Sequence, residues 1–177
     1  MQAQEIAAAL QRVQSVLLRR PSSGVHDDAP ATARWDGGTR VLASHANGTQ
    51  LATDMPGELG GSGDQVTPGW LFRAGLASCA ATSIAMAAAR QGIALATLEL
   101  QACSRSDARG LLGMAGADGV SVNAGPSDLQ LRVRIAAPGI APERLRELVE
   151  QALRCSPIPC AVQSAVPMAL HVDVGAA

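Results

Sequence analysis

Aromatic residues and lysine are scarce or missing in this sequence. Among 177 residues there is no tyrosine, one phenylalanine and two tryptophans, so we expect no nucleic-acid partner that stacks bases on aromatic side chains. All 14 basic residues are arginine, and the glycine-rich stretch 54–66 therefore lacks the lysine of a phosphate-binding loop. The formal net charge of −1 gives no reason to expect a polyanionic partner of another kind.

Targeting signals and metal-binding patterns are also missing. The first residues, Met1–Glu5, lack the basic start and the apolar core of a signal peptide, which predicts a cytoplasmic protein. In a reducing cytosol the four cysteines are more often catalytic or inert than joined in disulfides. Only Cys155 and Cys160 are close in sequence, and no histidine lies near them. We therefore expect neither a zinc site nor another cofactor.

The composition is that of a folded domain with a short appendage. Hydrophobic residues make up 47% of the chain and charged residues 16%, which favours a globule over a disordered chain. Residues 1–31 are predicted to form an amphipathic helix and a linker, because apolar side chains recur at helical spacing before Pro21. These side chains are Ile6, Leu10, Val13, Leu17 and Leu18. Residues 32–177 are predicted to form one α+β domain.

Turns and alternating residues predict an antiparallel sheet. Two short strands within 33–43 are joined by a tight Asp-Gly-Gly turn, and an Asn-Gly turn leads to a third strand at 50–53. Three further stretches alternate apolar and polar residues as half-buried strands do: 95–103, 129–135 and 166–174. With a helix from Pro142, the order β-β-β-α-β-β-α-β indicates an antiparallel sheet packed on a long central helix.

That central helix is predicted from Thr67 to Gly92. Thr67 is a good capping residue, Pro68 suits the first helical position, and Gly92 supplies a C-terminal stop. No residue between Arg73 and Arg90 is charged, so we expect the helix to be buried on every side. The uncharged run is shorter than the roughly 20 strongly apolar residues that a bilayer requires, and we expect no membrane partner.

Cys79 lies in the middle of this helix, and two interpretations of it stay open. It can be a small buried apolar side chain, because free cysteine is among the most buried residue types. It can instead be a redox thiol, which attacks a peroxide as the thiolate and requires a second thiol and, when buried, a cation. The sequence offers Cys155 or Cys160 as the second thiol and Arg40 as the cation.

The stretch Thr67-Pro68 followed by Leu71-Phe72-Arg73-Ala74-Gly75-Leu76-Ala77-Ser78-Cys79 resembles the signature helix of the OsmC/Ohr family, the osmotically inducible and organic hydroperoxide resistance proteins. Residues 156–168 are similar to the family's second signature, and the likeness covers roughly residues 32–175. It implies an OsmC-like fold in which two α+β chains form an intertwined homodimer. It also implies that Cys79 reduces alkyl or fatty-acid hydroperoxides and that a dithiol or lipoyl reductant restores it.

Two positions depart from the family pattern. Gly69 stands where the family enzymes have a glutamate that pairs with the arginine, and Ser156 stands where they have the resolving cysteine. Cys155 and Cys160 are the candidates to replace that thiol, although the two prolines between Ser156 and Cys160 argue against a helix there. The alternative to a peroxidase is a catalytically degenerate OsmC-like dimer that binds a small apolar or thiol-bearing ligand without turnover.

Overall fold

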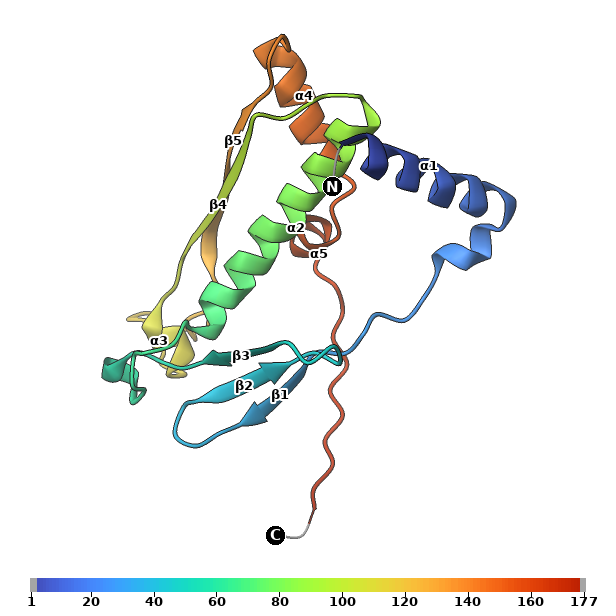
Figure 1. Cartoon of the computed structure of the whole chain (residues 1–177). Coiled ribbons are helices and arrows are strands. Elements are labelled where there is room, and N and C mark those ends of the chain that lie inside the picture. The colour runs from blue at the N-terminus through green and yellow to red at the C-terminus, as the bar shows by residue number, and fades with distance from the viewer. Residues whose placement is uncertain (1–2, 176–177) are drawn as a thin grey trace.

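The computed structural model describes residues 3–175 and has the α+β architecture that the sequence predicts. One long helix, α2 (Pro68–Arg90), runs through the molecule and contacts α1, β4, α4 and α5 (Figure 1). A three-stranded antiparallel sheet lies near the N-terminal end of α2, and a two-stranded antiparallel sheet runs along its side. The amphipathic helix α1 (Ala3–Arg19) packs on α2 and leads into a short 3-10 turn, η1 (Pro21–Gly24).

The first sheet has the strand order β1-β2-β3, and its turns are those predicted. Its strands are β1 (Thr32–Trp35), β2 (Val41–Ser44) and β3 (Gln50–Thr53). Trp35 pairs with Val41 across the first turn, where Gly37 and Gly38 both have positive φ, a conformation that favours glycine. A loop containing the 3-10 turn η2 (Gly57–Leu59) then connects β3 to α2.

Helix α2 begins and ends where the sequence predicts. The Thr67 side chain accepts a hydrogen bond from the Trp70 backbone N–H, and Gly92 takes a positive φ just beyond the last turn. By length and composition α2 could cross a membrane, but the core helix of a soluble protein passes the same test. Helix α2 contacts four other elements of the chain, and a single helix of this kind is weak evidence for a membrane span.

The prediction that α2 is buried on every side is wrong for the single chain. Four of its buried side chains recur every four residues and form one stripe, Leu76, Ala80, Ile84 and Ala88, and Ala89 is buried beside the last of them. Away from that stripe, Trp70, Phe72 and Met86 are exposed to 47%, 40% and 38%. The reason is that the β4–β5 sheet and the neighbouring helices cover only part of the surface of α2.

The second sheet pairs β4 (Thr97–Arg105) with β5 (Ser127–Ala136), and α3 (Ala108–Leu111) lies in the connection between them. Helix α4 (Pro142–Leu153) begins at the predicted proline. Its apolar stripe packs against α2, so that Leu145 and Leu148 join Ala88 and Ile93 in the hydrophobic core. Because this core holds α4 against α2, it also positions the residues that follow α4.

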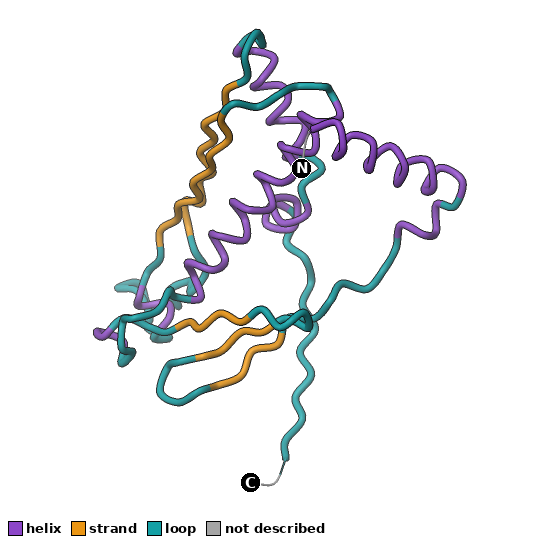
Figure 2. The backbone as a smooth tube through the Cα atoms, viewed as in Figure 1, coloured by secondary structure: helices purple, strands orange, loops and turns teal. Residues whose placement is uncertain are grey.

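Two expectations for the C-terminal part are wrong. Residues Pro157–Gln163 form a helix, α5, because both prolines lie in its first turn, where the backbone N–H groups have no intrahelical partner in any case. Residues 166–174, predicted as the closing strand, pair with no strand in the described chain. Instead they form an extended, exposed segment that runs away from the helices (Figure 2).

Candidate functional site

Cys79 lies half-buried in the middle of α2, on the side that faces α5. Its sulfur is 3.4 Å from the hydroxyl oxygen of Ser156, and the backbone N–H of Ile158 donates a hydrogen bond to the same sulfur over 3.4 Å. One turn before Cys79, Gly75 has no side chain, and a Cβ there would lie 3.8 Å from the end of Ile158. Ile158 therefore lies against α2 at a distance where a Cβ on residue 75 would make ordinary van der Waals contact.

Ser156 connects Cys79 to a second α2 residue. Its side chain is fully buried, and its hydroxyl oxygen accepts a hydrogen bond of 3.0 Å from Ser83. Ser83 follows Cys79 by four residues, so both side chains project from the same face of α2. Ser83 was not among the predicted site residues. Its four-residue spacing from Cys79 is the only signal in the sequence, and this spacing points to a site only once α5 lies beside α2.

The structure does not place either late cysteine against Cys79. The Cys160 thiol lies near the backbone oxygens of Leu153 and Arg154, at 3.7 and 3.3 Å. Cys155 is exposed and lines a cleft among α1, α2 and α4, together with Ser83 and Arg90. Among the described residues, the sulfur of Cys79 has hydrogen-bond contacts with Ser156 and Ile158, and all four cysteines are free.

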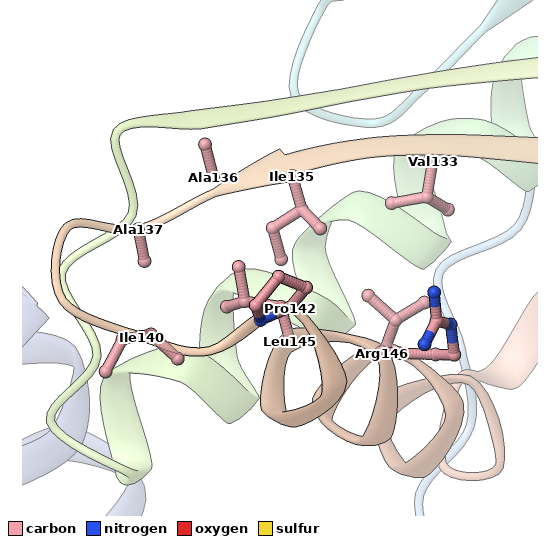
Figure 3. Close-up of a pocket in the computed structure, with 9 residues that line it drawn as sticks. Val133, Ile135, Ala136, Ala137, Ile140, Pro142, Leu145 and Arg146 are labelled. Atoms are coloured by element: carbon pink, nitrogen blue, oxygen red, sulfur yellow. The ribbon is translucent and has the colours of Figure 1, made fainter.

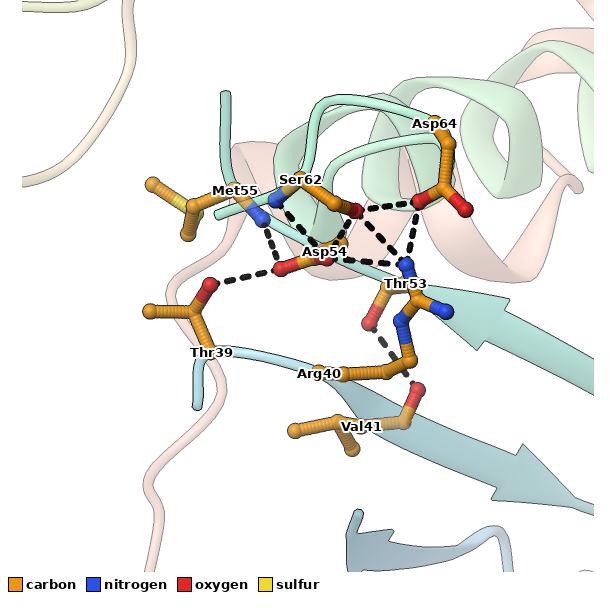
Figure 4. Close-up of polar contacts among 8 residues, drawn as sticks. All are labelled: Thr39, Arg40, Val41, Thr53, Asp54, Met55, Ser62 and Asp64. Atoms are coloured by element: carbon orange, nitrogen blue, oxygen red, sulfur yellow. Dashed lines mark hydrogen bonds and ion pairs between the residues drawn. The ribbon is translucent and has the colours of Figure 1, made fainter. Parts of the chain in front are cut away.

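Arg40 belongs to a separate polar cluster, which we call the Arg40 cluster: Thr39, Arg40, Asp54, Ser62 and Asp64 (Figure 4). The Arg40 guanidinium donates to the Asp54 carboxylate at 3.1 Å and to the Ser62 hydroxyl at 2.6 Å, and it also pairs with Asp64. These partners lie at the end of β3 and in the loop before α2. Within the described chain, Arg40 is therefore bound to carboxylates and does not contact the Cys79 sulfur.

Asp54 is the buried member of the Arg40 cluster, with 4% of its side chain exposed. Hydrogen bonds from the Ser62 and Thr39 side chains, at 2.7 and 2.5 Å, hold the pKa of the Asp54 carboxyl far below its ordinary value. The hydrogen bond with Ser62 likewise lowers the pKa of Asp64. A charged Asp54 thus ties the first sheet to the loop that leads into α2.

The comparison with protein families agrees with the fold. The model described as "OsmC-like protein" matches residues 61–171, which is more than half of the chain. This chain belongs to the OsmC-like family. The matched range includes α2, both β4 and β5, and the segment with Ser156, while α1 and the first sheet lie before it.

Solved structures of OsmC-like proteins have the same fold. An organic hydroperoxide resistance protein of Legionella pneumophila is 23% identical, with 79% of this chain and 92% of that chain covered and a TM-score of 0.58. An OsmC-like protein of Mycoplasma pneumoniae is 16% identical, with 80% of this chain and 91% of that chain covered and a TM-score of 0.65. An organic hydroperoxide resistance protein of Elizabethkingia anophelis is 21% identical, with 80% of this chain and 91% of that chain covered and a TM-score of 0.57. A search of the curated proteins found no match.

Gly69 lies in the first turn of α2, at the position where the family resemblance implies a glutamate. A Cβ at this position would lie 3.6 Å from the Arg73 guanidinium and 3.9 Å from the Thr67 hydroxyl, so a larger side chain has room there. Arg73 in turn donates to the Ser104 hydroxyl on β4, at 3.4 Å. Gly69 therefore provides no carboxylate, although the Arg73 guanidinium lies beside it.

An apolar pocket of about 450 Å³ lies between β5 and α4, away from Cys79 (Figure 3). Val133 and Ile135 line it from β5, and Pro142, Leu145 and Arg146 line it from α4. No group of three or more His, Cys, Asp or Glu side chains gathers in residues 3–175 in a way that could hold a metal ion.

Proposed function

We propose that this OsmC-like chain is a thiol-dependent peroxidase that reduces organic hydroperoxides through Cys79. The observation that carries the proposal is the pair of polar groups at the Cys79 sulfur: the Ile158 N–H, which donates to it, and the Ser156 hydroxyl, which is able to donate. Donors that point at a sulfur favour its charged form, and the thiolate is the nucleophile. The Legionella and Elizabethkingia proteins of the same fold are named for organic hydroperoxide resistance, which supports this substrate class.

In the proposed reaction, the Cys79 thiolate attacks the terminal oxygen of an alkyl or fatty-acid hydroperoxide. A sulfur–oxygen bond forms, the O–O bond breaks, and the alkoxide leaves as the alcohol after it takes up a proton. Cys79 becomes a sulfenic acid, which condenses with a second thiol to give a disulfide and water. A dithiol reductant of the lipoyl type then reduces the disulfide by exchange, so that two electrons from the reductant restore the Cys79 thiol.

Cys160 and Cys155 are our candidates for the second thiol, because they flank Ser156 on either side. Each needs the backbone around α5 to rearrange first, since Ser156 occupies the place beside Cys79 and the Cys160 thiol lies near backbone oxygens. Arg40 enters the reaction only after release from Asp54 and Asp64. We assign its role as the cation at Cys79 to such a rearranged state.

We also propose that the protein is a homodimer, as the family resemblance implies. The support is the exposed face of α2 and the apolar side chains of the extended C-terminal segment. In that segment every second residue is apolar and exposed: Val166, Met168, Leu170, Val172 and Val174. Sedimentation analysis should give twice the chain mass, and a chain ending at Gln163 should sediment as a monomer. If the chain ending at Gln163 also sediments at twice its own mass, the C-terminal segment has no part in the dimer.

The test of peroxidase activity follows the loss of cumene hydroperoxide with dihydrolipoamide as the reductant. The wild-type chain should turn over, and Cys79→Ser should show no more than the rate of the reductant alone. Cys103→Ser is the matched control, because Cys103 is a free, half-buried cysteine on β4. Equal rates for the wild type and Cys79→Ser would end the proposal.

The second candidate is a dimer that binds a small apolar molecule without turnover, and the pocket between β5 and α4 favours it. Its lining is apolar except for Arg146, which suits a fatty acid with a carboxylate. Decanoate should then raise the unfolding temperature of the wild type, and Val149→Arg should abolish the rise, because Val149 on α4 also lines the pocket. A wild type with no shift across fatty acids of different lengths would exclude this function.

A further inference from the structure

Ser156 occupies the N-cap position of α5 but does not cap the helix. Serine is favoured at this position because its oxygen normally accepts a hydrogen bond from a backbone N–H of the first turn. Here the Ser156 side chain makes no such bond. The fully buried hydroxyl turns instead toward α2, where its two partners are Cys79 and Ser83.

The hydrogen atoms of these groups can be assigned by counting. A serine hydroxyl has one hydrogen to donate and two lone pairs to accept with. Ser83 donates its hydrogen to the oxygen of Ser156 at 3.0 Å. The one hydrogen of Ser156 is then left for its other partner, the Cys79 sulfur at 3.4 Å. An ionised Cys79 has no hydrogen of its own, so it accepts this bond.

We infer that Ser156 is a catalytic residue that donates to the Cys79 thiolate, and that Ser83 is a positioning residue that holds the Ser156 hydroxyl in this orientation. The inference rests on the proposed function in that the thiolate serves peroxide reduction. The serine at the position of the family's resolving cysteine thus has its own use. It stabilises the attacking sulfur instead of closing a disulfide with it.

The experiment measures the alkylation of Cys79 by iodoacetamide as a function of pH in the full-length protein. Trypsin cleavage after Arg73 and Arg90 releases a peptide, residues 74–90, whose sole cysteine is Cys79, so mass spectrometry follows this thiol alone. The variants are Ser156→Ala, Ser83→Ala and Ser83→Thr. Ser78→Ala is the control, because Ser78 is an exposed neighbour of Cys79 on α2. Circular dichroism establishes that each variant is folded.

Ser156→Ala should move the midpoint of the alkylation profile to higher pH by about one unit, so that alkylation slows about tenfold at a pH well below both midpoints. Ser83→Ala should shift the midpoint in the same direction by less, and Ser83→Thr, which keeps a hydroxyl, should restore it. An unchanged midpoint in folded Ser156→Ala would overturn the inference. If Ser156→Ala does not fold, equal profiles for Ser83→Ala and Ser83→Thr would overturn it.

The outcome is separable from that of the peroxidase assay, because iodoacetamide reports the thiolate without any hydroperoxide. Shifted profiles together with no hydroperoxide consumption would support the roles of Ser156 and Ser83 and reject the proposed reaction. Unshifted profiles together with rapid hydroperoxide consumption would support the proposed reaction and reject the roles of the two serines.

Discussion

The hydroxyl oxygen of Ser156 lies 3.4 Å from the sulfur of Cys79, although 77 positions of sequence separate the two residues. A hydroxyl can donate to a thiolate, but it cannot form a disulfide. In the proposed reaction, the groups already in contact with Cys79 therefore support the attack on a hydroperoxide. The proposed regeneration of the thiol needs a second sulfur that does not contact Cys79 in the described chain.

Replacing Ser156 by cysteine should supply that sulfur directly. In a background with Cys155→Ser and Cys160→Ser, Ser156→Cys should form a disulfide with Cys79 after hydroperoxide treatment, because the two side chains already meet. Peptide mass spectrometry without reductant detects the link. The same background with Ser156 retained is the control and should form no link within the chain. A free thiol pair in the treated variant would mean that the α2–α5 contact is not as described.

Acid should weaken the Arg40 cluster through Asp54. Its pKa is lowered in the folded state, so its contribution to the free energy of unfolding is complete above the unfolded pKa of about 4 and is lost as the pH falls toward the folded value. Asp54→Asn should therefore lower the unfolding temperature most above about pH 5, with a difference that shrinks below about pH 4. Asp27→Asn, in the exposed segment before β1, should change little at any pH. A constant difference for Asp54→Asn from pH 7 to 3 would contradict the account.

Gly61 should tolerate no side chain. A Cβ there would lie 1.8 Å from the Met55 carbonyl oxygen and 2.9 Å from an Asp54 carboxylate oxygen. Gly61→Ala must therefore displace backbone beside the Arg40 cluster, at a cost of about 1–3 kcal/mol in the free energy of unfolding. Gly57→Ala in the same loop meets no atom within 4 Å and is the matched control. Chemical denaturation measures both, and equal stabilities would show that the loop is not packed as described.

Gly69→Glu should stabilise the protein by about 1–2 kcal/mol. The change removes a glycine from the first turn of α2, places a carboxylate at the positive end of the helix, and puts it one turn before Arg73. Gly69→Gln separates the two effects, because it removes the glycine without adding charge. Denaturation in low salt should rank glutamate above glutamine and glutamine above glycine. The reverse order would mean that the site is not an open helix terminus.

The sequence was sufficient to predict the features that local chemistry decides. The turn at Gly37-Gly38, the cap at Thr67, the end of α2 near Gly92 and the start of α4 at Pro142 all lie where residue preferences place them. Each depends on a few neighbouring residues. The family was also identifiable from the residues around Cys79, and the match over residues 61–171 confirms it.

The remaining features depend on contacts between distant segments. Alternation at 166–174 predicts a strand, but a strand needs a partner edge, and the described chain provides none there. Arg40 follows a glycine turn as expected, yet its partners are set by the fold of the loop 54–66. The link from Ser83 through Ser156 to Cys79 joins α2 to α5. No spacing in the sequence shows that these helices touch.

The central claim is that Cys79 itself reduces an organic hydroperoxide, and a single turnover tests it most directly. In a chain with Cys103→Ser, Cys155→Ser and Cys160→Ser, Cys79 is the sole thiol. One equivalent of cumene hydroperoxide should consume this thiol and release an equal amount of cumyl alcohol, and dimedone should label the resulting sulfenic acid in the peptide 74–90. An intact thiol beside unconsumed hydroperoxide would contradict the account.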